Sequence, residues 1–354
     1  MSKIGVLDGI RGLAALLVLW AHFPQIDGGL LLGYFQQGSR VFYAGYLGVD
    51  IFFALSGFLI TRILLKEKQS GTLSFSRFYL KRSLRIFPLY YLVIILVGVF
   101  ISWENLGWSA AYLSNYYFAF DHAPNALRHT WSLCVEEHFY LFWPLVISFM
   151  SLRNSKIFIA LVIPTLSIIS ALVALTMSEE GVLLVNKATH IRILTLSLGS
   201  LLAFHEPALK TISKAAIRSL TIVGFTLLIA LSCAHFYDDI LLVTLSRYIT
   251  SAGLSIVFLT LLLSLSFSNS SHVFVRFFHN QVFTFFGKIS YGVYLYHLPI
   301  FYYFNVSHMD GATPISIQLA AFLLLLCIAI PVVSFYAFEK PILAYKDRII
   351  GPLK

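Results

Sequence analysis

The stretch Ile4–Phe23, IGVLDGIRGLAALLVLWAHF, determines how the rest of the chain is interpreted. An apolar run of this length is enough for an α-helix that crosses a bilayer, yet it contains Asp8, Arg11 and His22. Ionisable groups inside a membrane span are costly and indicate function by default. At roughly 100° and 1.5 Å per residue, Arg11 and His22 share one helix face about 16 Å apart. The alternative is a structural role, in which Asp8 and Arg11 form an anchoring pair at the membrane border and His22 is a buried histidine with its hydrogen bonds satisfied.

The composition indicates a multi-pass membrane protein. The 354 residues are 58% hydrophobic and 12% charged, with a mean hydropathy of +0.83, which excludes an ordinary soluble domain. The first run is too long and too charged for a signal peptide, and residues 21–23 do not form a small-residue cleavage site. Cys134, Cys233 and Cys327 lie in apolar runs, so we expect small buried hydrophobes with no disulfide and no metal site.

The hydropathy pattern predicts an all-α bundle of ten membrane spans. These cover residues 4–23, 46–65, 86–103, 131–150, 157–177, 190–205, 219–235, 245–267, 289–306 and 314–337. With the N-terminus inside, the inner segments hold 20 of the 25 Lys and Arg residues, so both termini are expected in the cytoplasm. This asymmetry also explains the net charge of +9 without nucleic acid. We expect one membrane-embedded domain, 1–354, with no additional soluble domain.

The most basic segment lies between the second and third expected spans. Residues 79–87 are predicted to form a helix near the membrane surface, with Arg82 and Arg85 on one face because they are three residues apart. Two neighbouring guanidinium groups suit a phosphate. A topology-setting cluster that contacts anionic lipid headgroups is the alternative.

Three carboxylates are expected at the outer border of the membrane. Glu136 and Glu137 lie just inside the 131–150 span, and their side chains point about 100° apart. A carboxylate at this depth indicates a functional role; the alternative is a hydrated pair at the membrane interface with no function. Asp50 begins the 46–65 span and could orient a neighbouring histidine or arginine. In the same span, Ser56 is expected to serve helix packing as a small residue.

A stripe of polar rings lies on the ninth expected span. Tyr291, Tyr294 and His297 recur every three residues and therefore line one side of the helix. An aromatic belt at the membrane border would explain the tyrosines alone, whereas tyrosines and a histidine inside the span fit a polar channel.

Six segments together resemble the acyltransferase-3 family of bacterial integral membrane O-acyltransferases. They follow one another over almost the whole chain as LDGIRGLAALLVLWAHF, GVDIFFALSGFLIT, RFYLKRSLRIFPLYY, WSLCVEEHFYLFWP, KISYGVYLYHLPIF and FEKP. Each segment is weak alone, but their order and spacing are specific. Cys134 and His138 stand where the family commonly has Ser and Gln, and we expect no change of reaction from them.

The resemblance implies an acyl-CoA donor, usually acetyl-CoA, on the cytoplasmic side of the bacterial inner membrane. It implies as acceptor a hydroxyl of a cell-surface or exported glycan, such as an O-antigen or exopolysaccharide. Arg11 and His22 match the family's Arg-x10-His element, and Arg82 and Arg85 match its Arg-x-x-Arg element, associated with the CoA phosphates. Glu136 matches the acidic position after Trp-Ser-Leu. Membrane lipid is a further expected partner, and a homo-oligomer is left open.

These residues suggest a mechanism. The pantetheine arm would pass Arg11 and bring the thioester near His22, which takes the acceptor's proton as general base or itself receives the acyl group. Glu136 or Asp50 would fix the imidazole tautomer, and a tyrosine of the 289–306 span would polarise the carbonyl. A proton-coupled transporter uses similar buried groups, but the chain has no inverted repeat or paired broken helices.

Overall fold

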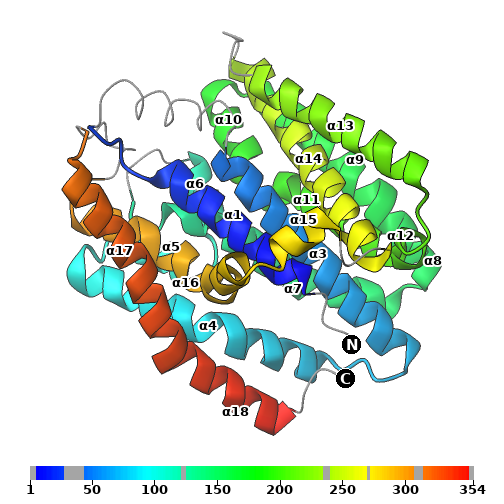
Figure 1. Cartoon of the computed structure of the whole chain (residues 1–354), viewed down its shortest axis with the longest axis horizontal. Helices are drawn as coiled ribbons and strands as arrows, with labels where there is room; N and C mark the ends of the chain where they lie inside the picture. The colour runs from blue at the N-terminus through cyan, green and yellow to red at the C-terminus, as the bar shows by residue number, and fades with distance from the viewer. Residues whose placement is uncertain are drawn as a thin grey trace.

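The computed structural model describes residues 5–27, 44–120, 125–233, 240–268, 272–306 and 314–350, and this part is an all-α bundle (Figure 1). Its regular elements are helical apart from one β-bridge, between Ile26 and Ile315. The helices are α1 Val6–His22, α3 Ala44–Gln69, α4 Phe75–Phe100, α5 Leu106–Ala110, α6 Ser114–Phe120, α7 Trp131–Phe149, α8 Leu152–Ile157, α9 Ile163–Leu175, α10 Ser178–Lys187, α11 Thr189–Phe204, α12 Glu206–Leu209, α13 Lys214–Cys233, α14 Ile240–Ser268, α15 Val273–Phe278, α16 Gln281–Tyr303, α17 Ile317–Ser334 and α18 Lys340–Ile350. A 3₁₀ turn, η1, covers Arg128–Thr130 and leads directly into α7.

The described part contains six segments that are long and apolar enough to cross a membrane. They are Gly45–Gln69, Phe75–Phe100, Leu152–Leu175, Lys214–Leu231, Ile240–Phe267 and Ile317–Tyr345. The class of multi-pass helical membrane protein is therefore confirmed. The other four expected spans correspond to α1, α7, α11 and α16, which contain most of the candidate polar residues. The total of ten spans and the side on which each terminus lies stay predictions.

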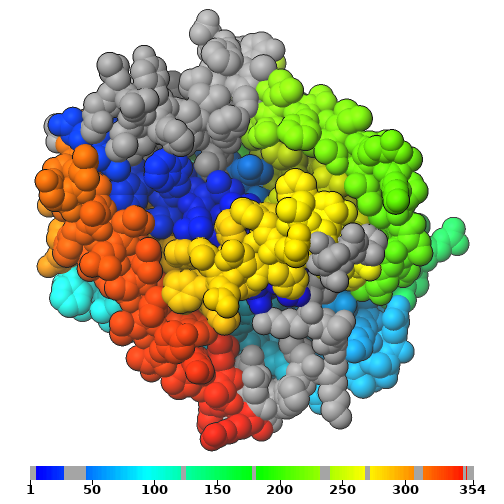
Figure 2. Space-filling model, viewed as in Figure 1, coloured from blue at the N-terminus to red at the C-terminus, as the bar shows by residue number. Residues whose placement is uncertain are grey.

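The outer surface is rich in apolar side chains on the peripheral helices. Leu166 on α9, Ile222 on α13 and Leu325 on α17 are each about 60% exposed (58%, 67% and 61%). In Figure 2, α17 and α18, coloured orange to red, flank one side of this face, α13 in green flanks the other, and α1 and α15 lie between them. Exposed apolar surface on this scale suits contact with lipid rather than water.

Glycines allow the central helices to touch backbone to backbone. On α1, a Cβ added at Gly12 would lie 2.2 Å from the Phe283 carbonyl oxygen, and one at Gly287 on α16 would lie 1.8 Å from the Asp8 carbonyl oxygen. The α3–α11 contact is built in the same way, because a Cβ at Gly57 would lie 2.0 Å from the carbonyl oxygen of Leu196. Small residues at these crossings bring helices distant in sequence into direct contact.

The basic segment 79–87 is helical, as predicted, but it is continuous with the apolar segment that follows it. It belongs to α4, which runs without interruption from Phe75 to Phe100 and contains Pro88 in its interior. Proline removes one backbone hydrogen bond and normally breaks or kinks a helix. Here Ile86 and Leu89, on either side of Pro88, are both buried, so side-chain packing continues past the proline. As a result, the two arginines lie on a helix that enters the bundle.

An ion pair made by Arg62 connects α3 to the short helix α12. Its Nε lies 2.6 Å and one terminal nitrogen 3.2 Å from the two carboxylate oxygens of Glu206, and Lys210 lies 3.3 Å from the same carboxylate. Burial alone would raise the pKa of Glu206, but the hydrogen bonds and charges of Arg62 and Lys210 outweigh it and hold that pKa below its ordinary value. The carboxylate therefore stays ionised and keeps both cations in place.

Candidate functional site

A polar cavity of about 460 Å³ lies among α1, α3, α4, α7 and α16. Six of the residues singled out in the sequence line it together: Arg11, Arg82, Arg85, Glu136, Tyr291 and Tyr294. The other charged residues in the lining are Asp8, Lys288 and Glu339. The cavity thus holds four cations and three carboxylates inside a bundle of apolar helices, which is a concentration of charge that packing alone does not require.

Arg11 lies within the bundle and is paired with a neighbour on its own helix. Its Nη1 atom lies 3.0 Å from Oδ1 of Asp8, and the two side chains are 22% and 17% exposed. The Asp8–Arg11 pair that the sequence suggested as an anchor therefore exists, and both of its members also line the cavity. The two interpretations of Arg11 do not exclude each other.

The two arginines of α4 line one cavity but occupy different settings. The Arg82 guanidinium stacks on the ring of Tyr140, with Cζ 4.4 Å from the ring centroid. Arg85 is exposed, as is Lys288 of α16, which lines the same cavity. Arg85 and Lys288 therefore belong to its solvent-accessible part, whereas Arg82 is held against α7. We call the exposed part with Arg85 and Lys288 the basic mouth; Arg82 is less exposed, so the two arginines do not form a symmetrical fork.

Glu136 is held in a three-membered hydrogen-bond network. Ser56 donates to one carboxylate oxygen at 2.8 Å, and the Tyr140 hydroxyl lies 3.2 Å from the other and 2.8 Å from the Ser56 hydroxyl. Ser56 therefore makes polar contacts in addition to the packing expected of a small residue. Glu137 is absent from the cavity lining, as expected for adjacent helical residues that point in different directions.

The two tyrosines of α16 both line the cavity and both make specific hydrogen bonds. Tyr291 donates to the carbonyl of Ile86 on α4 at 2.9 Å. Tyr294 donates to the carbonyl of His129 at 2.5 Å and lies 2.6 Å from the hydroxyl of Ser132, another lining residue. Tyr291 thus ties α16 to α4, and Tyr294 ties it to the start of α7.

His22 lies beside the cavity rather than in its lining. Its Nδ1 is 3.0 Å from the carbonyl oxygen of Val18 on the same helix and 3.3 Å from Nε2 of His297. Tyr294, which lines the cavity, packs against His297 with ring centroids 5.9 Å apart, so the histidines are the next layer behind this tyrosine. The Val18 carbonyl, rather than Glu136 or Asp50, orients the ring of His22.

The sequence analysis missed His129. This residue lies in η1, its side chain is 3% exposed, and its ring packs 4.8 Å from that of His297. Its Nε2 lies 3.2 Å from the carbonyl oxygen of Leu295 on α16. The sequence feature that could have indicated His129 is its position two residues before Trp131. That feature was weak, because a histidine in a connecting turn ordinarily faces water.

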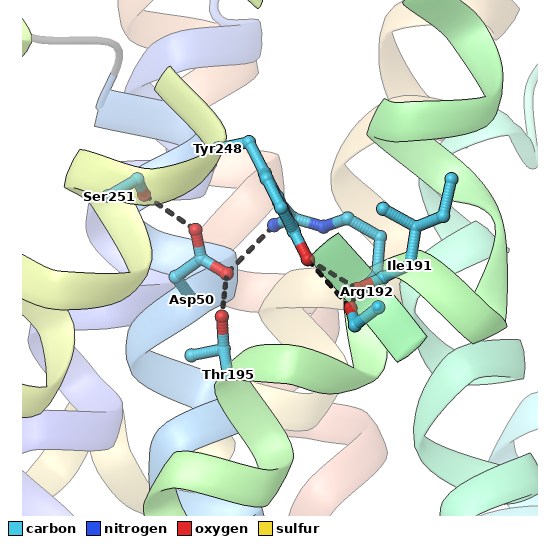
Figure 3. Close-up of polar contacts among 7 residues, drawn as sticks. Asp50, Ile191, Arg192, Thr195, Tyr248 and Ser251 are labelled. Atoms are coloured by element: carbon cyan, nitrogen blue, oxygen red, sulfur yellow. Dashed lines mark hydrogen bonds and ion pairs between the residues drawn. The ribbon is translucent and has the colours of Figure 1, made fainter. Parts of the chain in front are cut away.

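Asp50 belongs to a second polar cluster between α3, α11 and α14 (Figure 3). Its carboxylate accepts hydrogen bonds from Arg192 at 2.8 Å, Thr195 at 2.9 Å and Ser251 at 2.5 Å. Asp50 and Arg192 are almost completely buried, at 0% and 2% exposed. Tyr248 completes the cluster by donating to the Ile191 carbonyl at 2.9 Å. The arginine that Asp50 orients comes from α11 and is not one of the cavity arginines.

These features define a helical membrane protein with a charged cavity, whose exposed charged lining residues are basic and which is backed by histidines. Residues 4–336 match the acyltransferase-3 family, described as an acyltransferase domain. The chain belongs to this family, and the resemblance noted from its six segments is confirmed.

Two similar relatives are both named O-acetyltransferase OatA. One is from Staphylococcus aureus strain NCTC 8325 and the other from strain COL, and each is 29% identical over 360 residues, covering 95% of this chain and 57% of the relative. The chain spans about half the length of the curated relatives it matches, 54% to 57%. No solved structure gives a significant match.

Proposed function

We propose that this protein is a membrane O-acyltransferase that moves an acyl group, most often acetyl, from cytoplasmic acyl-CoA to a hydroxyl of a cell-surface or exported glycan. The family membership and the names of the relatives support acyl transfer. The observation that carries the proposal is the joint lining of one cavity by Arg11, Arg82, Arg85 and Glu136, which lie on three helices.

The basic mouth supports an anionic donor. Arg85 and Lys288 are exposed and line the cavity together, so they offer cationic donors to the phosphates of CoA. Arg82 is less exposed and lies over the ring of Tyr140. In this proposal the nucleotide end stays at the mouth, and only the uncharged pantetheine arm enters the bundle, which avoids moving a polyanion through lipid.

The histidines beside the cavity support activation of a hydroxyl. The Nδ1 proton of His22 points at the Val18 carbonyl, because a carbonyl oxygen can only accept. The lone pair of the neutral ring is then on Nε2, the atom that would take a proton from an acceptor hydroxyl. Glu136 and Tyr294 are the lining residues available to orient the acceptor or polarise the thioester carbonyl.

The first prediction concerns donor binding. Arg85→Ala should raise the Kd for acetyl-CoA about tenfold, the equivalent of about 1.4 kcal/mol, and Arg85→Lys should restore only part of the loss because lysine cannot bind a phosphate with a planar fork. Isothermal titration of the protein in nanodiscs measures both. The matched control is Arg77→Ala, which removes an exposed arginine of the same helix outside the cavity lining. Equal affinity of the Arg85 and Arg77 variants would contradict the donor site.

The reaction itself is tested in sealed vesicles that contain the protein and the envelope glycans of the host. Labelled acetyl-CoA added on the cytoplasmic side should yield acetylated glycan. Movement of a labelled small solute with a proton gradient, and no acetylated glycan, would identify a transporter instead.

A further inference from the structure

Three imidazole rings form a cluster behind the cavity. His22 comes from α1, His129 from the η1 turn and His297 from α16. The rings of His22 and His297 lie 5.1 Å apart and those of His129 and His297 lie 4.8 Å apart, measured between centroids. His129 and His297 are 3% and 1% exposed. Two buried titratable rings and a partly buried third one, gathered inside a membrane bundle, indicate a function beyond packing.

Backbone carbonyls determine the tautomers of these rings. Nδ1 of His297 lies 3.1 Å from the Val293 carbonyl oxygen, and Nδ1 of His22 lies 3.0 Å from that of Val18. Because a carbonyl oxygen only accepts, each of these nitrogens carries a proton. Neutral His297 therefore has its lone pair on Nε2, which lies 3.3 Å from Nδ1 of His22. The Nδ1 proton of His22 is thus within hydrogen-bond distance of two acceptors, one of which is a base.

We propose that His297 is the proton partner of His22, so that the two rings act as a relay during acyl transfer; this rests on the function proposed above. The acceptor hydroxyl gives its proton to Nε2 of His22 as its oxygen bonds to the thioester carbon. The Nδ1 proton of His22 passes at the same time to Nε2 of His297. His22 leaves this step neutral, with its proton on Nε2, and His297 carries the positive charge.

The second half of the reaction reverses the transfer. The C–S bond breaks and CoA leaves as a thiolate, which takes the Nε2 proton of His22 while the extra proton of His297 returns to Nδ1 of His22. The products are the ester and CoA thiol, both rings recover their starting tautomers, and no additional reactant is needed.

The surroundings of His297 suit a short-lived cation. The ring of Phe301 lies 6.2 Å away at an interplanar angle of 76°, and the Val293 carbonyl accepts the other proton. The neighbouring ring of His129 holds a buried Nδ1 that has no hydrogen-bond partner among the described residues. Its Nε2 faces the Leu295 carbonyl, so this Nδ1 is a bare acceptor beside the relay. Burial disfavours a charge on His297, so the cation is short-lived and the proton returns to His22.

His297→Gln tests the relay because glutamine can still hydrogen-bond His22 but cannot take a proton. We expect kcat for transfer from acetyl-CoA to the host's envelope glycan fraction to fall about 10- to 100-fold, with KM for acetyl-CoA within twofold because the cavity lining is unchanged. Tyr296→Phe is the matched control: Tyr296 is buried on the same helix, its hydroxyl contacts Ser334, and it lies outside the cluster. Its kcat should equal that of the wild type.

A proton inventory provides a readout that a merely structural role would not change. Single-turnover rates in mixtures of H₂O and D₂O should follow a curve for the wild type, because two protons move together, and a straight line for His297→Gln. A straight line for the wild type, a kcat of His297→Gln within twofold of wild type, or a loss of folded protein in this variant alone would overturn the relay. If the wild type itself transfers no acetyl group, the proposed function fails instead.

Discussion

At the scale of single residues, Glu136 and Glu137 show how two adjacent carboxylates can occupy different surroundings. Its oxygens are held by Ser56 and Tyr140 while it faces the cavity. Tyr140 in turn carries the Arg82 guanidinium on its ring. The charge, the two hydroxyls and the cation form one connected unit. Glu137, one residue later, has no place in it.

This difference predicts unequal effects of two similar substitutions. Glu136→Gln keeps the shape of the side chain but removes its charge, so we expect acetyl transfer to fall at least about tenfold, within the range that positioned acid–base groups contribute. Glu137→Gln should leave the rate within about twofold. Initial rates with purified proteins at equal acetyl-CoA occupancy compare the two. A greater loss of activity in the Glu137 variant would mean that Glu137, and not Glu136, has the role in transfer.

The sequence could supply candidate residues at this scale, but not which of them meet. The spacing of Arg11 and His22 placed both on one helix face without any knowledge of α16. In contrast, the contact of His22 with His297 joins residues 275 positions apart, and the Asp50–Arg192 pair joins residues 142 positions apart. Neither leaves a local pattern, since helical periodicity relates only near neighbours. His129 was missed because its burial depends entirely on packing against α16.

At the scale of helices, the crossing of α1 and α16 sets the geometry of the site. Gly12 and Gly287 let the two backbones touch, and this close approach places His22 beside His297 and Arg11 in the cavity. The apolar runs predicted α1 closely, because the bilayer fixes the length of a span, but α16 begins at Gln281, eight residues before the expected span. They did not predict that α4 begins at Phe75 and joins the basic segment to the expected 86–103 span, because the tertiary contacts that support it are remote in sequence.

A methyl group at this crossing should therefore be costly. Gly287→Ala would place Cβ 1.8 Å from the Asp8 carbonyl oxygen, and backbone cannot yield as a flexible side chain can, so the helices must separate. We expect a lower Tm in a detergent thermal-shift assay and loss of transfer activity. Gly107→Ala is the control, since a Cβ there meets no atom within 4 Å. Equal Tm values for the two variants would show that the close approach of α1 and α16 is not required.

At the scale of the whole molecule, the Asp50–Arg192 pair holds together helices that the cavity does not connect directly. Asp50 on α3 binds α11 through Arg192 and Thr195, and α14 through Ser251 (Figure 3). The Arg192 guanidinium also lies over the rings of Phe53 and Trp131, at 5.8 and 5.6 Å. Phe53 lines the cavity, so the cluster supports the cavity wall from behind.

A double-mutant cycle can measure this support. Asp50→Asn keeps an oxygen for Thr195 but leaves the Arg192 guanidinium buried without a counter-charge, which typically costs about 3–5 kcal/mol. Arg192→Gln leaves the carboxylate in the same position and should cost a similar amount. The double variant removes both charges, so its loss of stability should be well below the sum of the two single losses. Unfolding midpoints in detergent, measured for all four proteins, give the coupling. Purely additive losses would mean that the two charges act independently, and the packing of Arg192 against Phe53 and Trp131 would then carry the support of the cavity wall.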